Sequence, residues 1–254
     1  MNGKIKIFSK ANMLEQNLRL SLVLVITVIL SIFLNNTFII GEFLSRMPSL
    51  SVYISPLIKR LLISLIGVFS YIALVPFNYG RDIWFYENAR KNRLSPAKLF
   101  SFYGIRKSFG AIKITLAVQV RKFIITFLFL IPSVTVGGYI IFALKEGIGQ
   151  LIFIALTASS VVLGITGIFF AFVFCQRYFL APYLFFENEP CKVNEIVNLS
   201  CKIMDKKCFE TAMLKLSFFP WWLLCILVFP AIYVYPYYKL SISFKAITIL
   251  TNNA

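Results

Sequence analysis

Long uncharged stretches dominate the pattern of hydrophobic and polar positions along this chain. Five of them hold 22, 20, 22, 30 and 23 consecutive residues without a charged side chain. A helix needs about 20 mostly apolar residues to cross the roughly 30 Å hydrocarbon layer of a membrane. The stretches lack the alternation of barrel strands, and helices are the other structures that satisfy their backbone polar groups in lipid. The pattern therefore predicts an all-α, polytopic helical membrane protein.

Five transmembrane helices are predicted, within a single integral membrane domain over residues 1–254. The predicted spans lie near residues 20–40, 61–80, 123–144, 151–176 and 216–235. The 35 residues from Leu216 to Leu250 are too many for one upright span and too few for two full ones. The tail after Pro236 is therefore predicted to be an interfacial or re-entrant segment, with a sixth span as the alternative.

The basic residues divide unevenly between the two sides of these spans. The N-terminal segment and the segments 81–122 and 177–215 carry 20 of the 26 Lys and Arg residues, and the opposite side, which includes Lys239 and Lys245, carries six. Positive charge accumulates on the cytoplasmic side of membrane proteins. We therefore predict a multi-pass protein of the plasma membrane with its N-terminus in the cytoplasm, where the segments 81–122 and 177–215 also lie.

Both cytoplasmic segments are predicted to contain amphipathic helices of the kind that lie along the membrane plane. In the first segment, Ser95 and Pro96 are a typical N-cap and first helical residue. In the second, apolar or small residues recur at steps of three and four positions. These residues are Val193, Ile196, Val197, Ser200, Met204 and Cys208.

Composition narrows the class of function. Charged residues make up 14% of the chain, against about 25% in a soluble domain. The net charge is +16, but the basic residues are dispersed among the spans, so nucleic acid is not expected as a partner. Histidine, the commonest general base and transition-metal ligand, is absent. The five cysteines contain no Cys-x-x-Cys pair, and the ten acids show no metal-binding spacing. We predict no catalytic residue, no metal and no cofactor.

Small residues follow one face of the fourth predicted span, where they allow close approach of a second helix. They are Thr157, Ser160, Gly164, Gly167 and Ala171. We expect this face to pack against another span of the same chain; a dimer seam or a substrate-facing groove is the alternative.

Two prolines fall within predicted spans, Pro132 in the third and Pro230 in the fifth. An interior proline removes a backbone hydrogen bond, so each is predicted to kink its helix. A static kink is expected, with a hinge as the alternative.

Basic and aromatic residues alternate in the segment 81–122, which holds ten basic and two acidic residues. Each basic residue near an anionic leaflet contributes about 1 kcal/mol of attraction, and aromatic rings favour the interface. Anionic lipids of the cytoplasmic leaflet are the predicted partners, with a protein partner or a second copy of this chain as alternatives. The residues assigned to the lipid interface are Trp84, Arg90, Lys91, Arg93, Lys98, Arg106, Lys107, Trp221 and Trp222.

The C-terminal third contains an Ala-Pro-Tyr turn, a helix with Ser and Met, a Leu-Ser-Phe…Trp sequence and a late Pro-Tyr pair. These signature residues are Ala181, Pro182, Tyr183, Ser200, Met204, Leu216, Ser217, Phe218, Trp221, Pro236 and Tyr237. In them the chain resembles a bacterial family of polytopic integral-membrane proteins known only as a domain of unknown function. The resemblance implies a bacterial membrane protein without an assigned activity. Pro182 is expected to end the fourth span.

The leading interpretation is a non-enzymatic membrane protein whose basic, aromatic cytoplasmic face contacts anionic lipid or a partner. Ion- and proton-coupled transporters usually keep a charged group within the bilayer, and the five stretches have none. One alternative is a permease or the membrane subunit of a transporter, which would use the small-residue face and the kinked spans. Another is a lipid-modifying membrane enzyme, which would need acids such as Glu187 or Asp205 at the interface.

Overall fold

The structure is a computed structural model that describes residues 2–35, 56–90, 94–145, 149–188, 192–225 and 229–252. Within these ranges the regular structure is helical and contains no strand, which confirms the predicted all-α class. Ile105–Phe142 and Gln150–Glu187 are long and apolar enough to cross a membrane. The bent pair Asn2–Glu15 and Arg19–Ile32 adds a third crossing if it is taken as one span. Five spans are not supported for the described part of the chain.

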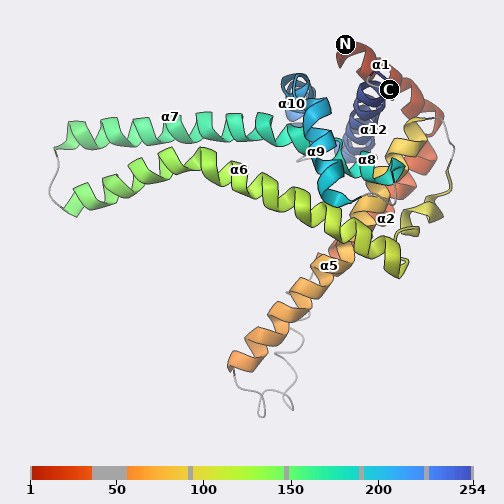
Figure 1. The fold of residues 1–254 in the computed structure, drawn as a ribbon, viewed down its shortest axis with the longest axis horizontal. Coiled ribbons are helices and arrows are strands. Elements are labelled where there is room, and N and C mark those ends of the chain that lie inside the picture. The colour runs from red at the N-terminus through yellow and green to blue at the C-terminus, as the bar shows by residue number, and fades with distance from the viewer. Residues whose placement is uncertain are drawn as a thin grey trace. The chain divides into compact units, whose positions relative to one another are not determined.

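The chain forms two compact units. Unit 1 takes residues 1–115 and 218–252, and unit 2 takes residues 116–217. The helices of unit 1 are α1 (Asn2–Glu15), α2 (Asn17–Asn35), α5 (Pro56–Ala89), the 3-10 helix η1 (Pro96–Phe100), the start of α6 (Ile105–Lys145), α11 (Phe219–Leu224) and α12 (Phe229–Thr251) (Figure 1). Those of unit 2 are the rest of α6, α7 (Gln150–Phe174), the 3-10 helix η2 (Cys175–Tyr178), α8 (Ala181–Glu187), α9 (Val193–Met204) and α10 (Cys208–Leu216).

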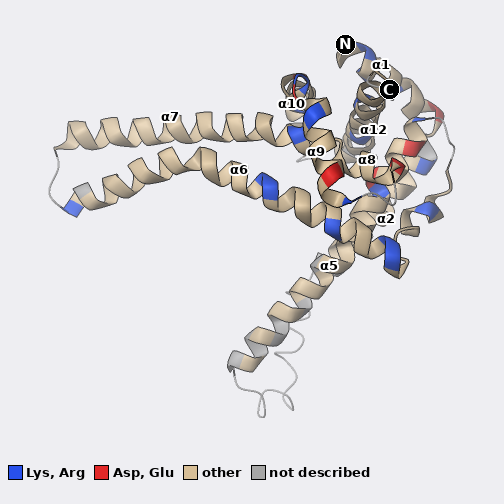
Figure 2. Ribbon diagram, in the orientation of Figure 1, with Lys and Arg blue, Asp and Glu red and all other residues tan. Residues whose placement is uncertain are grey.

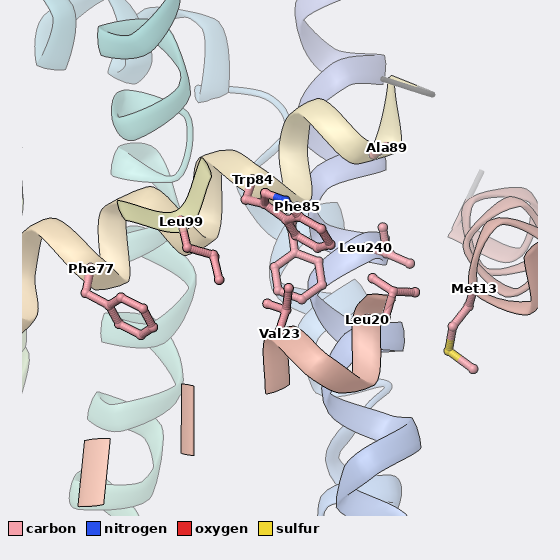
Figure 3. Packing of buried hydrophobic residues seen from close by; sticks show 9 residues of the cluster. All are labelled: Met13, Leu20, Val23, Phe77, Trp84, Phe85, Ala89, Leu99 and Leu240. Atoms are coloured by element: carbon pink, nitrogen blue, oxygen red, sulfur yellow. The ribbon is translucent and has the colours of Figure 1, made fainter. Parts of the chain in front are cut away.

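The core of unit 1 forms where α12 packs against α1, α2 and α5. Figure 3 shows Leu20 and Val23 of α2, Trp84 and Phe85 of α5 and Leu240 of α12 turned toward one another. Burial of such large apolar side chains stabilises the folded state by about 1.5–3 kcal/mol each. The second half of α5 supplies four of the nine buried residues of this core, whereas its first half extends away from it (Figure 1) and exposes apolar residues to its surroundings.

The predicted fifth span is wrong as a single helix over residues 216–235. The helices α10, α11 and α12 share this region, and α12 begins only at Phe229. Pro230 is the second described residue of α12, and residues 226–228 lie outside the described residues, so its kink stays a prediction. The prolines inside helices of unit 1 are Pro76 in α5 and Pro236 in α12.

The predicted interfacial tail is also different in the structure. Residues after Pro236 continue α12 to Thr251, and Leu240, Ala246 and Ile249 are buried completely. The sequence is apolar here because neighbouring helices, rather than lipid headgroups, cover this part of α12.

In unit 2, α6 and α7 run side by side (Figure 1) and are joined by two serines. Ser133 Oγ donates to the carbonyl of Ser160 at 2.9 Å, and Ser160 Oγ donates to the carbonyl of Ser133 at 3.2 Å. Gly167 lies against the backbone carbonyl of Phe129, and Gly164 lies near Ser133. Three members of the small-residue face thus contact α6 of the same chain.

The remaining members of that face differ in exposure. Ala171 is buried, whereas Thr157 is exposed and its hydroxyl donates to the carbonyl of Phe153 in its own helix. Pro132 lies inside α6, which Figure 1 shows as a bent helix. Most other side chains of both helices are apolar and exposed, and Figure 2 shows no charged residue along α7. These two helices offer the surface that lipid would cover.

The apolar periodicity predicted for residues 193–208 is confirmed over α9, whereas its last member, Cys208, belongs to α10. Its buried residues are Ile196, Val197, Ser200 and Met204. This face packs against α8 and η2. That the helix lies along the membrane plane stays a prediction. Pro182 also differs from its expected role, because it lies in the first turn of α8 and begins that helix.

The contact between Gly167 and α6 can be tested with a single methyl group. An added Cβ at Gly167 would lie 2.5 Å from the carbonyl oxygen of Phe129, so we expect Gly167→Ala to cost about 1–3 kcal/mol of stability. Gly138, also in this helix pair, has nothing within 4 Å of its Cβ position. There Ala should stabilise by about 0.5–1 kcal/mol through helix propensity. Thermal unfolding in detergent measures both, and equal effects would contradict the close contact.

Candidate functional site

A basic and aromatic surface lies on η1 and the first turns of α6. Its exposed members are Lys98, Phe100, Tyr103, Ile105, Arg106, Lys107, Phe109 and Lys113. We call it the 98–113 surface. The sequence contains no Asp or Glu between Glu87 and Glu146, and the charged residues that Figure 2 shows on α6 are all basic. Ile105 is 93% exposed, so an apolar side chain stands among the charges.

Contacts with α5 hold this surface in place. The predicted N-cap is confirmed, because Ser95 Oγ accepts from the N–H of Ala97. The carbonyl of Ser95 accepts from Trp84 Nε1 at 3.2 Å. Gly80 has no side chain, and the backbone of Leu99 occupies the space that a Cβ would need. The hydroxyl of Tyr103 donates to the carbonyl of Ala73 at 3.1 Å, and partial burial raises the pKa of Tyr103.

The residues predicted to lie at the lipid interface have different positions in the structure. Lys98, Arg106 and Lys107 belong to the 98–113 surface. Trp221 and Trp222 are also exposed, on the short helix α11. Lys91 and Arg93 lie outside the described residues.

Trp84 was wrongly assigned to the interface. It is only 1% exposed and lies in the core of unit 1 (Figure 3). Arg90 lies directly after α5 and contacts Tyr86 of that helix: it donates to the hydroxyl of Tyr86 at 2.8 Å, and its guanidinium lies 4.7 Å from the centroid of that ring. An aromatic residue in a basic segment is typical of an interface, but here the indole N–H finds its acceptor inside the protein.

The family-signature residues mostly serve packing. Ala181, Tyr183, Ser200, Met204 and Phe218 are buried. Ser200 Oγ donates to the carbonyl of Arg177, and Ser217 Oγ donates to that of Leu214. Pro236 is buried within α12, Tyr237 packs its ring edge against Phe218, and Leu216 is exposed.

An ion cluster joins α5 and α12. Asp82 Oδ1 accepts from Lys239 Nζ at 2.7 Å and from Arg81 Nε at 3.2 Å. The side chains of Lys239 and Arg81 are 18% and 13% exposed, so both cations are largely removed from water. The Arg81 guanidinium lies 5.8 Å from the ring centroid of Tyr235. No local sequence pattern indicates this cluster, because Asp82 and Lys239 stand 157 positions apart.

Burial and charge act in opposite directions on this cluster. Burial raises the pKa of Asp82, but the nearby charges of Lys239 and Arg81 outweigh it and hold that pKa below its ordinary value. Burial lowers the pKa of Lys239, and the carboxylate of Asp82 opposes the change only in part. The carboxylate is therefore the group that keeps two cations in this site.

The ion pair corrects the predicted topology. The sequence analysis placed segment 81–122 on one side of the membrane and Lys239 and Lys245 on the other. A contact of 2.7 Å cannot bridge a hydrocarbon layer of roughly 30 Å. Lys239 and Asp82 therefore lie on the same side of any membrane that the chain spans. Lys245, on the same helix, has a fully buried side chain in unit 1.

Few described residues are candidates for a metal site or a catalytic site. Among the described residues, no group of three His, Cys, Asp or Glu side chains is placed to hold a metal ion. Glu187 and Asp205, the acids considered for an enzyme, are both exposed, and Asp205 pairs with Arg177 at 2.8 Å. No protein-family model, curated protein or solved structure matches the chain.

The ion cluster predicts an uneven response to mutation. Asp82→Asn removes the carboxylate that both Lys239 and Arg81 contact. Removing one partner of a buried pair costs about 3–5 kcal/mol, and partial exposure of Asp82 should reduce this to about 2 kcal/mol. We expect the Tm in detergent to fall by about 4–8 °C. The double variant D82N/K239M should recover most of the loss, and a Tm equal to wild type in D82N would contradict the cluster.

The same variant reports the pH dependence. Because the folded pKa of Asp82 is lowered, its stabilisation is present above the ordinary value of 3.8 and is lost as pH falls through the folded value. The Tm difference between wild type and D82N should therefore shrink only below about pH 4.

Proposed function

We propose that this protein is a non-enzymatic, multi-pass protein of the bacterial plasma membrane whose 98–113 surface binds anionic lipid of the cytoplasmic leaflet. The observation that carries the proposal is the exposure of four basic residues among aromatic and apolar ones, with no acid in that part of the chain. They are Lys98, Arg106, Lys107 and Lys113.

Two kinds of attraction combine on this surface. Each basic residue near an anionic leaflet gains about 1 kcal/mol, and the exposed side chains of Phe100, Ile105 and Phe109 gain further when they leave water. Lys113 Nζ lies 4.5 Å from the ring centroid of Phe109, so charge and ring face the same region. The surface is held by α5, and binding therefore needs little ordering of the chain.

The proposal includes four membrane crossings and a cytoplasmic N-terminus. The crossings are the first four predicted spans, which fall on α2, residues 61–80 of α5, the second half of α6 and α7. Residues 36–40 of the first span lie outside the described residues. An even number returns the C-terminus to the cytoplasm, as the pairing of Lys239 with Asp82 requires. Lys239 and Lys245 then join the inner side, which strengthens the basic bias to 22 residues against four.

The alternatives have less support. A permease would need the small-residue face of α7 as a groove, but Ser160, Gly164 and Gly167 pack against α6. A lipid-modifying enzyme has no observation in its favour beyond the exposure of Glu187 and Asp205. The family resemblance agrees with a bacterial membrane protein and remains a prediction.

Lipid binding can be measured on the full chain in mild detergent. The variant K98Q/R106Q/K107Q/K113Q should bind short-chain phosphatidylglycerol at least about tenfold more weakly than wild type, since four favourable charges are lost. Phosphatidylcholine binding should stay unchanged. The matched control is K4Q/K10Q/K202Q/K206Q, which removes four exposed lysines elsewhere. Equal loss in both variants would show a dispersed charge effect and contradict a localised surface.

The four-crossing topology has a direct test. A fluorescent protein fused after Ala254 should fold and fluoresce, because the C-terminus is expected in the cytoplasm. A reporter that is active only after export should be inactive at the same position. The reverse pattern would return Lys239 to the outer side and contradict the proposed crossings.

A further inference from the structure

Helix α11 exposes every one of its six residues, Phe219–Leu224. Its five large apolar side chains are between 38% and 60% exposed. Consecutive positions of a helix differ by about 100°, so the run from Trp221 to Leu224 presents apolar side chains around most of the helix. A protein partner that docks on one face leaves the other faces in water, whereas hydrocarbon surrounds a helix on all of them.

Aromatic contacts fix the start of α11 on α12. Phe218, directly before α11, is completely buried, and its ring centroid lies 5.2 Å from that of Tyr237 and 5.3 Å from that of Tyr238. One turn further along, the ring centroid of Trp222 lies 5.4 Å from that of Tyr238. Helix α11 is therefore held in place by unit 1, although its own side chains stay largely uncovered.

The charges around α11 are complementary to a lipid leaflet. No Asp or Glu follows Glu210 in the sequence, and no charged residue stands between Lys215 and Lys239. Lys6 Nζ of α1 lies 4.8 Å from the ring centroid of Phe218, so a cation lies beside the start of α11. Cations favour the level of the lipid phosphates, and tryptophan favours the boundary between headgroups and acyl chains.

The length of α11 limits how deeply it can enter a membrane. Six helical residues rise about 9 Å, well short of the roughly 30 Å hydrocarbon layer. The uncharged stretch 216–238 also begins and ends on one side, a step that rests on the proposed function, in which segment 177–215 and Lys239 are both cytoplasmic. Helix α11 can therefore enter only the inner leaflet.

We infer that α11 is an interfacial anchor that inserts among the acyl chains just below the headgroups of the cytoplasmic leaflet. The acyl chains cover the apolar side chains of Phe219–Leu224, and the base at Phe218 transmits this attachment to α12. The anchor shares no residue with the 98–113 surface. Its binding comes from hydrocarbon contact, so it needs no anionic headgroup.

Tryptophan fluorescence measures this insertion in the full chain. Of the three tryptophans, Trp84 is 1% exposed in the core of unit 1, and Trp221 and Trp222 lie on α11. The protein is reconstituted into phosphatidylcholine vesicles whose acyl chains carry bromine, a contact quencher, either near the headgroup or near the chain end. We expect shallow bromine to lower the emission about twofold, and more than deep bromine does, because an interfacial helix lies about 5–10 Å into the headgroup and acyl boundary.

Two pairs of variants locate the quenching on α11. W221F/W222F should lose most of it, because only the enclosed Trp84 then emits. L223N/L224N should reduce it several-fold, since two acyl contacts are replaced by amides. The matched control L223I/L224I keeps the apolar surface and should respond as wild type does. Both leucines are exposed in the folded protein, so the Tm of either variant in detergent should stay close to that of wild type.

The result can be separated from a failure of the proposed function. The vesicles contain no anionic lipid, so K98Q/R106Q/K107Q/K113Q should be quenched as wild type is, and the C-terminal fusion reports the topology independently. The anchor would be overturned by an emission that neither brominated lipid lowers, by stronger quenching from deep bromine, or by equal quenching in W221F/W222F. Aqueous iodide that reached Trp221 and Trp222 in vesicles would likewise overturn it and leave α11 for a protein partner.

Discussion

The ion pair between Asp82 and Lys239 is the contact that places these parts of α5 and α12 on one side of any membrane. It fixes α12 against the second half of α5, and α1 and α2 complete the enclosure. Charges removed from water lose their hydration, and an opposite charge within a few ångströms is needed to offset that loss. The pair therefore excludes any layout that places the two helix segments at opposite membrane surfaces.

The sequence predicted those features that a local pattern encodes. The helical class, the buried face of α9 and the cap at Ser95 each follow from residues within a few turns of one another. It did not predict the pairing of Asp82 with Lys239, which joins distant positions, or the burial of Trp84, whose acceptor lies at Ser95 beyond the end of α5. Local composition has no information about such partners.

The uncharged stretches show a second limit of the pattern. An apolar stretch reports that side chains avoid water, but it does not say whether lipid or protein replaces the water. In α7 the apolar residues are exposed, as expected for lipid contact, whereas Val234 and Leu240 of α12 are enclosed by helices. The sequence predicts a span over residues 216–235 for this reason, although these residues are shared among α10, α11 and the start of α12.

The central place of α12 has a consequence for biosynthesis. Among the helices of unit 1 it is the last to leave the ribosome, yet α1, α2 and α5 all pack on it. Until it arrives, Asp82 and Arg81 stand without Lys239, and the apolar side chains around Trp84 lack their cover. The core of unit 1 can therefore be completed only after α12 has been translated. A truncated chain that lacks α12 exposes the charged residues Arg81 and Asp82 and the apolar residues around Trp84 to the proteases that remove unfinished membrane proteins.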